Sequence, residues 1–290
     1  MSTRQEGFTL VELIVVMVVT GILATGLVVF FRPAMTSYIS VLNRAELTDR
    51  ADTAMRIMLR DIRLAVPNSF RQPGDQCFET IPTSDGGRYR SARDTTNNLS
   101  EPVDTSTTTT VFDVVSPFVN VPANGDWIVV ANQNTADVYA GTNRQAISSV
   151  STPPAMAPAP ELGRHRITLA APLQFPMGYD NNRFVVVPNS QRAVLYACIG
   201  ATGINASSGN GKGTLYRFAN YGFPATRTSC PNSPDSTAHI VATGVSSCAF
   251  TLDPNPGAIQ GAGYVELKLQ LTKNNESVDL LFGAHTDNLP

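Results

Sequence analysis

A long apolar run lies near the start of the chain. It covers 8–31, is interrupted only by Thr, Gly and one acid, Glu12, and carries no charge from Leu13 to Phe31. At about 1.5 Å of rise per residue, a helix over 8–31 would span about 36 Å, enough for the hydrocarbon core of a bilayer. The pattern predicts a membrane-spanning helix, and Arg4 before it predicts a cytoplasmic amino end.

Beyond Pro33 the apolar positions recur every three, four or seven residues, as they do on one face of a helix. Glu46 and Arg50 have the spacing of a favourable i,i+4 pair. The helix should end before Pro67, because the residue before a proline is pushed out of the α region. We expect one helix from Phe8 to Val66, whose part 32–66 packs on the protein's own head rather than on a partner helix. The expected stripe is Ile39, Leu42, Ala45, the polar break Asp52, Met55, Leu59, Ile62 and Val66.

After residue 67, short β-branched and aromatic stretches alternate with turn residues, and no helical periodicity is visible. The pattern predicts an α+β fold in which 67–290 forms a β-rich head. Hairpin turns are expected at 204–213 and at Asn274-Asn275, and the proline-rich segment 151–160 is expected to be a surface loop. The expected strands lie at 77–82, 109–115, 126–130, 166–169, 183–188, 192–198, 213–218, 245–252, 264–271 and 277–282.

Composition narrows the classes of function. Of the 290 residues, 42% are apolar and only 15% are charged, against roughly 25% charged in a typical soluble domain. The 21 Lys and Arg nearly balance the 23 Asp and Glu, which gives a net charge of −2. This argues against a large electrostatic footprint for nucleic acid, so no nucleic-acid partner is expected. The apolar content also excludes an acidic disordered chain.

Glu12 is the anomaly of the apolar run, since a carboxylate deep in hydrocarbon costs about 2.5–3.5 kcal/mol. A secretory signal peptide fits poorly, because the run is longer than an h-region and no small-x-small cleavage site follows it. A plain signal anchor is the alternative. Cleavage between Gly7 and Phe8 would place a cationic amine four residues before Glu12, about 6 Å along the helix axis. The two charges could then pair within one subunit or between neighbouring subunits.

The residues Gly7-Phe8-Thr9-Leu10-Val11-Glu12 resemble the type IV prepilin signature, G-F-[ST]-L-[IVL]-E, placed ahead of a long apolar helix. The resemblance implies a type IV pilin-like fold in which 1–7 is a leader. It also implies that a membrane prepilin peptidase cuts after Gly7 and N-methylates Phe8, and that Glu12 guides docking into a helical fibre. Major pilins often carry a proline where this chain has Val29. Here the proline comes at Pro33, so no kink is expected at Val29.

Looser motifs in the head, such as 77–82, 195–198 and 245–250, resemble the O-type minor pilin of the MSHA (mannose-sensitive haemagglutinin) pilus. The plan is also similar to that of the J-type minor pseudopilin of type II secretion. The resemblance implies a non-catalytic subunit in the inner membrane with a periplasmic head, which then joins other pilins in a pilus or pseudopilus. A bulky head suits a position at or near the tip, where the subunit would help to initiate assembly. A surface adhesin or DNA-uptake receptor is the alternative from another class.

The four cysteines are expected to form disulfides, because the periplasm is oxidising. Four cysteines allow three connectivities. Cys198 and Cys248 both lie in expected strands of the C-terminal third, which makes a cross-strand pair the first choice and leaves Cys77 with Cys230. The rival is a local loop between Cys230 and Cys248.

No catalytic constellation is visible, and neither a catalytic residue nor a cofactor is expected. His165, His239 and His285 are far apart and form no HExxH motif. The segment 209–213 fails the P-loop pattern, which needs a glycine where Ala206 stands. No metal site is assigned. The clusters Asp180-Asn181-Asn182 and Asp253-Pro254-Asn255 have the oxygen ligands that calcium prefers, but such residues usually serve as turns.

Overall fold

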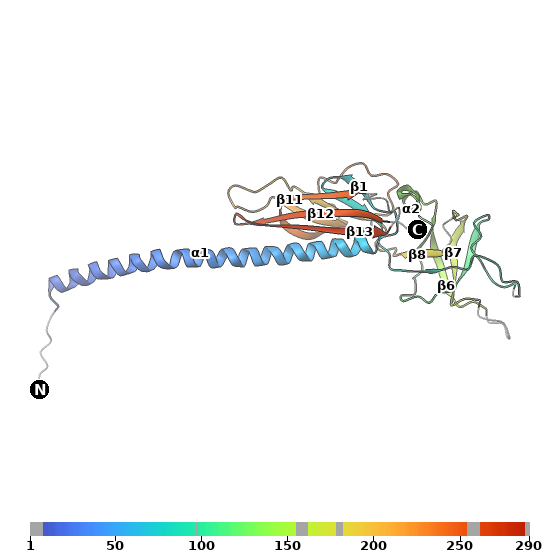
Figure 1. Cartoon of the computed structure of the whole chain (residues 1–290), viewed down its shortest axis with the longest axis horizontal. Coiled ribbons are helices and arrows are strands. Elements are labelled where there is room, and N and C mark those ends of the chain that lie inside the picture. Colours follow the sequence, from blue (N-terminus) through green and yellow to red (C-terminus); the bar gives the residue numbers. More distant parts are fainter. Residues whose placement is uncertain (1–7, 97, 155–161, 178–181, 254–261, 288–290) are drawn as a thin grey trace, which may run out of the picture.

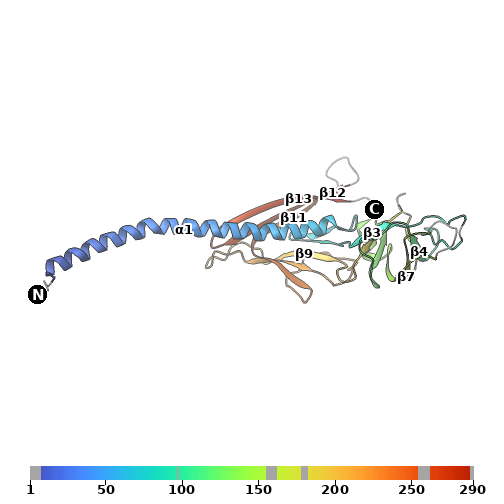
Figure 2. The same cartoon turned by 90° about the horizontal axis from the view of Figure 1, so that it is seen from below.

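The computed structural model describes residues 8–96, 98–154, 162–177, 182–253 and 262–287. One long helix, α1 (Leu10–Arg63), projects from a β-rich head, and its amino end lies far from that head (Figure 1). The head contains two antiparallel sheets, one of seven strands and one of six. The seven-stranded sheet lies beside the second half of α1, and the six-stranded sheet lies beyond the carboxyl end of the helix (Figures 1 and 2).

The seven-stranded sheet has the strand order β1-β2-β9-β10-β11-β12-β13. Its longest strands form the β11–β12–β13 meander, and α1 packs mainly on β13 and β12. The strands are β1 (Arg71–Gly74), β2 (Cys77–Thr80), β9 (Val194–Ile199), β10 (Gly213–Phe218), β11 (Ala238–Asp253), β12 (Ala262–Lys273) and β13 (Glu276–Asp287).

The six-stranded sheet has the order β3-β8-β5-β6-β7-β4, and its two outer strands also meet. Tyr89, just after β3, forms an antiparallel bridge with Val114 of β4. Backbone hydrogen bonds of 2.9 Å from Val115 to Arg88 and from Arg90 to Asp113 extend that contact. The sheet therefore closes into a small barrel. Its elements are β3 (Asp85–Arg88), β4 (Thr109–Val114), β5 (Trp127–Val130), the short helix α2 (Thr135–Ala140), β6 (Arg144–Ser151), β7 (His165–Leu173) and β8 (Arg183–Val187).

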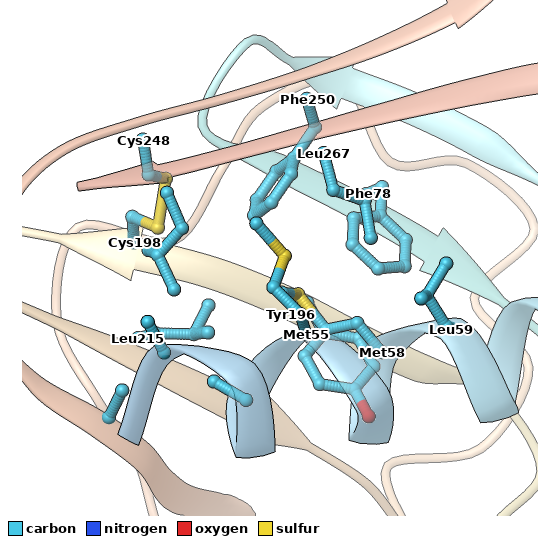
Figure 3. Packing of buried hydrophobic residues seen from close by; sticks show 14 of the residues in the cluster. Met55, Met58, Leu59, Phe78, Tyr196, Cys198, Leu215, Cys248, Phe250 and Leu267 are labelled. Atoms are coloured by element: carbon cyan, nitrogen blue, oxygen red, sulfur yellow. A yellow bond between two sulfur atoms is a disulfide. The ribbon is translucent and has the colours of Figure 1, made fainter. Parts of the chain in front are cut away.

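The core of the first sheet forms where one face of α1 meets the strands. The helix contributes buried side chains that recur at helical spacing, and the strands contribute large aromatic and aliphatic side chains. Figure 3 shows Met55 and Met58 of α1 beneath Phe78 and Leu267, with Tyr196 beside them. The helix residues that are buried here are Leu47, Ala51, Ala54, Met55, Met58, Leu59 and Ile62.

The barrel has a separate core, which follows from the alternation of residues along its strands. In β5, Ile128 and Val130 point into the barrel, whereas Val129 belongs to the cluster outside it. In β8, Phe184 and Val186 likewise point into the barrel, whereas Val185 and Val187 belong to the cluster outside it. The outer faces of β5 and β8 thus become the surface that joins the barrel to the rest of the head.

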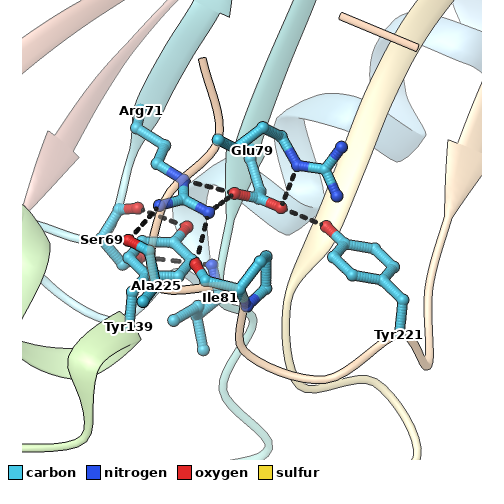
Figure 4. A network of polar contacts seen from close by, with 9 residues as sticks. Ser69, Arg71, Glu79, Ile81, Tyr139, Tyr221 and Ala225 are labelled. Carbon is cyan, nitrogen blue, oxygen red and sulfur yellow. Dashed lines mark hydrogen bonds and ion pairs between the residues drawn. The ribbon is translucent and has the colours of Figure 1, made fainter. Parts of the chain in front are cut away.

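A buried polar network lies in this joint (Figure 4). The carboxylate of Glu79, fully buried in β2, accepts hydrogen bonds from Arg71, from the Tyr221 hydroxyl at 2.6 Å and from Arg227 Nε at 3.1 Å. The guanidinium of Arg71 lies over the ring of Tyr139, a residue of α2. Burial raises the pKa of the Tyr139 hydroxyl, which donates to the Ser69 carbonyl at 2.9 Å. Because each of these groups is engaged by the others, the network fastens α2 to the seven-stranded sheet.

The structure corrects several sequence-based expectations. The described helix covers Leu10–Arg63 instead of the range from Phe8 to Val66. The expectation of no helix after residue 67 is wrong, because α2 forms there. Helix α2 begins with a capping box between Asn134 and Asp137. It has only 6 residues, which is too short to show helical periodicity in the sequence. Strands β1, β3 and β6 were also not expected.

The apolar stripe of the helix is confirmed only in its second part. Met55, Leu59 and Ile62 are buried, but Ile39 and Leu42 are each 49% exposed. Ala45 is exposed as well. The head reaches only as far as Asn43, so Ile39 and Leu42 have no covering strand. Ala45 is two residues from both of the buried positions 43 and 47, which places it on the opposite side of the helix. The expected i,i+4 pair between Glu46 and Arg50 is confirmed, with 2.5 Å between Oε1 and Nη2.

Candidate assembly helix and its attachment to the head

The helix begins at a capped turn that contains Glu12. Thr9 is the N-cap, and its Oγ1 accepts a hydrogen bond from the Glu12 backbone N–H at 3.3 Å. The same hydroxyl donates to Glu12 Oε2 at 3.4 Å. This Thr-x-x-Glu spacing is that of a capping box, a signal that the sequence analysis did not use. The carboxylate therefore has a local partner and also lies at the positive end of the helix dipole.

The other expected processing residues lie at the border of the described chain. Gly7 lies outside the described residues, while Phe8 is the first described residue and is 79% exposed. No described part of the head covers this end of the helix, which lies at the far end of the molecule from the barrel (Figure 1). The bond between Gly7 and Phe8 therefore adjoins a helix end that is free of the head.

The first half of α1 is an exposed apolar rod. An 18-residue window of this helix has a mean hydropathy of 2.8, and none of it is buried in the molecule. By length and composition the helix is able to cross a membrane. Large apolar side chains remain exposed from Phe8 to Leu42. That length corresponds to about 50 Å of helix, whereas a bilayer core is about 30 Å thick.

Residues beyond the expected membrane segment remain apolar. Arg32 is the first charge after Glu12. Past it, Met35, Tyr38, Ile39 and Val41 are exposed by 49–62% of their surface. The helix is unbroken through Pro33, although a proline there leaves the Val29 carbonyl without its usual i+4 donor. The exposed apolar surface thus continues from the membrane segment up to the head.

Two ion pairs fasten the helix where it first meets the head. Arg44 Nε lies 2.6 Å from Glu276 Oε2, and Lys273 Nζ lies 2.5 Å from Glu46 Oε2. Both strand residues flank the β12–β13 turn. The hydrogen bond from Lys273 lowers the pKa of Glu46, and the one from Arg44 lowers the pKa of Glu276. Asn274 and Asn275, expected in this turn, both have positive φ angles.

A buried network fastens the last turns of the helix. Asp61 of α1 accepts from the Tyr196 hydroxyl at 2.7 Å and from Arg217 Nε at 2.8 Å, and its side chain is only 6% exposed. Arg217 also donates to Gln191 Oε1 at 2.8 Å. Burial raises the pKa of the Tyr196 hydroxyl, which therefore stays protonated and continues to donate. One acid on the helix is thereby bound to two adjacent strands, β9 and β10.

Two disulfides complete the attachment. Cys198 is bonded to Cys248, and Cys77 to Cys230, so the alternative local loop between Cys230 and Cys248 does not form. The first bond lies in the core between β9 and β11, above α1 (Figure 3). The second holds the connection between β10 and β11 against β2.

The structure brings no catalytic or metal-binding set together within the described residues. No group of three His, Cys, Asp or Glu side chains is placed to hold a metal ion in that part of the chain. His165 lies in β7, His239 in β11 and His285 in β13. Of the calcium candidates, Asp180 and Asn181 in one cluster and Pro254 and Asn255 in the other lie outside the described residues. So does most of the proline-rich segment 151–160.

A comparison with known proteins gives a family match at the start of the chain, where α1 begins. Residues 2–28 match the family described as the prokaryotic N-terminal methylation motif. No curated protein and no solved structure matches the chain significantly. The matched segment holds Gly7, Phe8 and Glu12 and the first third of α1, but none of the head. The motif and the long apolar helix support a type IV prepilin-like protein, either a pilin or a pseudopilin.

Proposed function

We propose that this chain is a non-enzymatic minor pilin that takes part in assembling or priming a type IV pilus of the MSHA type. In this proposal a prepilin peptidase cuts after Gly7 and methylates the Phe8 amine. The helix holds the protein in the inner membrane, with the head in the periplasm, until the subunit joins other pilins. It requires no cofactor, metal or nucleic acid.

The observation that carries the proposal is the length of the exposed apolar rod. Its large side chains continue to Leu42, about 20 Å past what a bilayer core covers. Exposed apolar surface of this extent in water normally marks an interaction site. Packing against the helices of neighbouring subunits would cover both the membrane part and the part beyond it.

A tip position is supported by the shape of the head. The barrel extends the molecule beyond the carboxyl end of α1, along the same direction as the helix (Figures 1 and 2). A subunit in the shaft has neighbours above and below it, whereas one at the tip has space ahead of it. The barrel would occupy that space.

The first experiment follows processing. The intact mass and amino-terminal residue would be measured on protein from its native membrane, with and without an active prepilin peptidase. We expect a chain that begins at N-methylated Phe8 only when the peptidase is active. An unprocessed amino end under both conditions would contradict the proposal.

A second experiment separates the charge of Glu12 from its capping role. Glutamine also serves at this position of a capping box, so Glu12→Gln keeps the helix start but removes the charge. We expect the variant to be cleaved and inserted normally but to be lost from sheared fibres. Glu46→Gln, on the same helix but outside the apolar run, is the matched control and should assemble. Normal incorporation of Glu12→Gln would contradict an assembly role for the charge.

Partner identity distinguishes the remaining alternatives. Crosslinking from Ile39, an exposed position of the rod, should capture other pilins of an MSHA-type pilus. Capture of type II secretion pseudopilins instead would assign the chain to a pseudopilus. If the chain is an adhesin or a DNA-uptake receptor, it should still bind its surface ligand when the rod is blocked. A DNA gel shift with salt titration or a cell-binding assay would measure that binding.

A further inference from the structure

A cavity of about 380 Å³ opens at the joint between the helix end and the barrel. Apolar groups form most of its lining, and they come from the outer faces of β5 and β8 and from the chain just after α1. Two glycines of β3 line another part, and a side chain at either position would meet Phe184. The lining residues include Val66, Pro67, Gly86, Gly87, Val129 and Val185.

Two arginines line this cavity. Arg88 of β3 and Arg183 of β8 both line it, and they are directly opposite each other in the antiparallel pair. Both are exposed, and neither forms an ion pair with any residue that the structure describes. Like charges directly opposite across two strands destabilise the pair. An anion between them would remove that repulsion.

The described acid closest in sequence to Arg88 is already engaged. Asp85, also on β3, accepts backbone hydrogen bonds from Gly86 at 2.7 Å through Oδ1 and from Asn120 at 2.6 Å through Oδ2. Its carboxylate thus holds the backbone at Asn120 against β3 and does not neutralise Arg88. Within the part of the chain that the structure describes, the positive charge at the cavity has no acidic partner, and a carboxylate from another molecule would supply one.

We propose that this cavity binds an extended peptide segment of a partner protein, which inserts an apolar side chain and places a carboxylate against Arg88 and Arg183. The volume falls in the range of small-ligand and side-chain pockets. Guanidinium groups bind carboxylates through paired, charge-assisted hydrogen bonds. An apolar lining with only two cations suits such a segment better than a nucleic acid, which needs a longer basic track.

The position of the cavity makes this binding independent of fibre packing. It is lined by residues that follow the carboxyl end of α1, whereas the exposed rod begins at the opposite end of the same helix. A subunit could therefore bind the peptide with its rod already covered. The inference does not rest on the proposed pilin function, and its test uses the unassembled protein.

The test measures binding of three probes to the full chain in lipid nanodiscs by saturation-transfer NMR and calorimetry. The first probe is acetylated Ser-Leu-Phe with a free carboxylate, the second is its amide, and the third is acetylated Ser-Ser-Ser with a free carboxylate. We expect the first to bind about tenfold more tightly than either of the others, because each lacks one of the two required groups. The preference for the acid should fall as salt is raised.

The variants Arg88→Glu and Arg183→Glu should each abolish the preference for the acid over the amide. Lys268→Glu, an equal charge change at an exposed position of β12, is the matched control and should leave it intact. Circular dichroism and hydrogen exchange in β8 would verify that the variants are folded. Equal affinities for acid and amide, a preference unchanged in both arginine variants, or no binding of any probe would overturn the proposal.

Discussion

The two sheets of the head reach stability in different ways. The seven-stranded sheet is held by α1, by both disulfides and by the Asp61 network, and it keeps two open edges, β1 and β13. The six-stranded sheet contains none of the four cysteines and closes on itself through Tyr89 and Val114. Closure supplies backbone partners to the outer strands, which otherwise need protection. An open sheet that must support a projecting helix relies on covalent and ionic links instead.

The comparison predicts that the two sheets can be destabilised separately. Each has its own hydrophobic core, and the joint between them consists of a smaller apolar cluster that includes Val129 and Val187, together with the polar network around Glu79. Hydrogen exchange followed by mass spectrometry reports on each region by itself, which a single melting temperature does not.

Removal of the core disulfide should produce the largest difference. Cys198 and Cys248 are 50 residues apart in sequence, and in the chain-entropy account such a link stabilises by about 4 kcal/mol. We expect the double variant Cys198→Ala and Cys248→Ala to lose protection in β9, β11 and the second half of α1. Protection in β5 and β8 of the barrel should be retained. Equal loss in both regions would show that the sheets unfold as one unit.

A matched pair of acids provides the next test. Asp61 binds Arg217 in the first sheet, and Asp113 binds Arg166 at 2.7 Å in the barrel. Both carboxylates are buried, so their removal leaves an arginine partly buried without a partner, which costs about 3 kcal/mol. We expect Asp61→Ala to expose α1 and β10, and Asp113→Ala to expose β4 and β7. If either variant affects the other region equally, the barrel and the sheet are coupled through the joint.

The parts that sequence reasoning predicted correctly are those with a strong local signal. The apolar run and the later helical stripe predicted α1, and the strand at 213–218 coincides with β10. The first-choice cysteine pairing is also the one in the structure, because both Cys198 and Cys248 lie in strands that face the same core. In each case the strand or helix assignment that the prediction used comes from residues close in sequence.

The parts that were not predicted depend on distant partners. Strand β3 contains two glycines and no β-branched residue, and it forms because β8 supplies its hydrogen-bond partners. The helical stripe repeats through Leu42, but only the extent of the head determines where burial begins. Barrel closure joins Tyr89 to Val114 and Asp113 to Arg90, which no local pattern encodes. The cavity lined by Arg88 and Arg183 likewise depends on the pairing of β3 with β8.

The smallest expected effect concerns the ion pairs at the helix entry, Arg44–Glu276 and Glu46–Lys273. Since the partners lower the pKa of both glutamates in the folded protein, the pairs stabilise above the ordinary value of 4.5 and are lost as the pH falls below it. The double variant Glu46→Gln and Glu276→Gln should therefore melt slightly below the natural chain at pH 7, and the gap should be smaller at pH 3.5.

Glu266→Gln on β12 is the control for this difference. Glu266 forms no ion pair with the described part of the chain, so its substitution should shift melting equally at both pH values. A gap for the double variant that is undiminished at pH 3.5 would mean that the glutamates act through packing of their side chains. Convergence of the melting temperatures of the double variant and the natural chain would instead show that charge attaches the β12–β13 turn to α1. The Asp61 network at the other end of the docked helix differs, because it is buried.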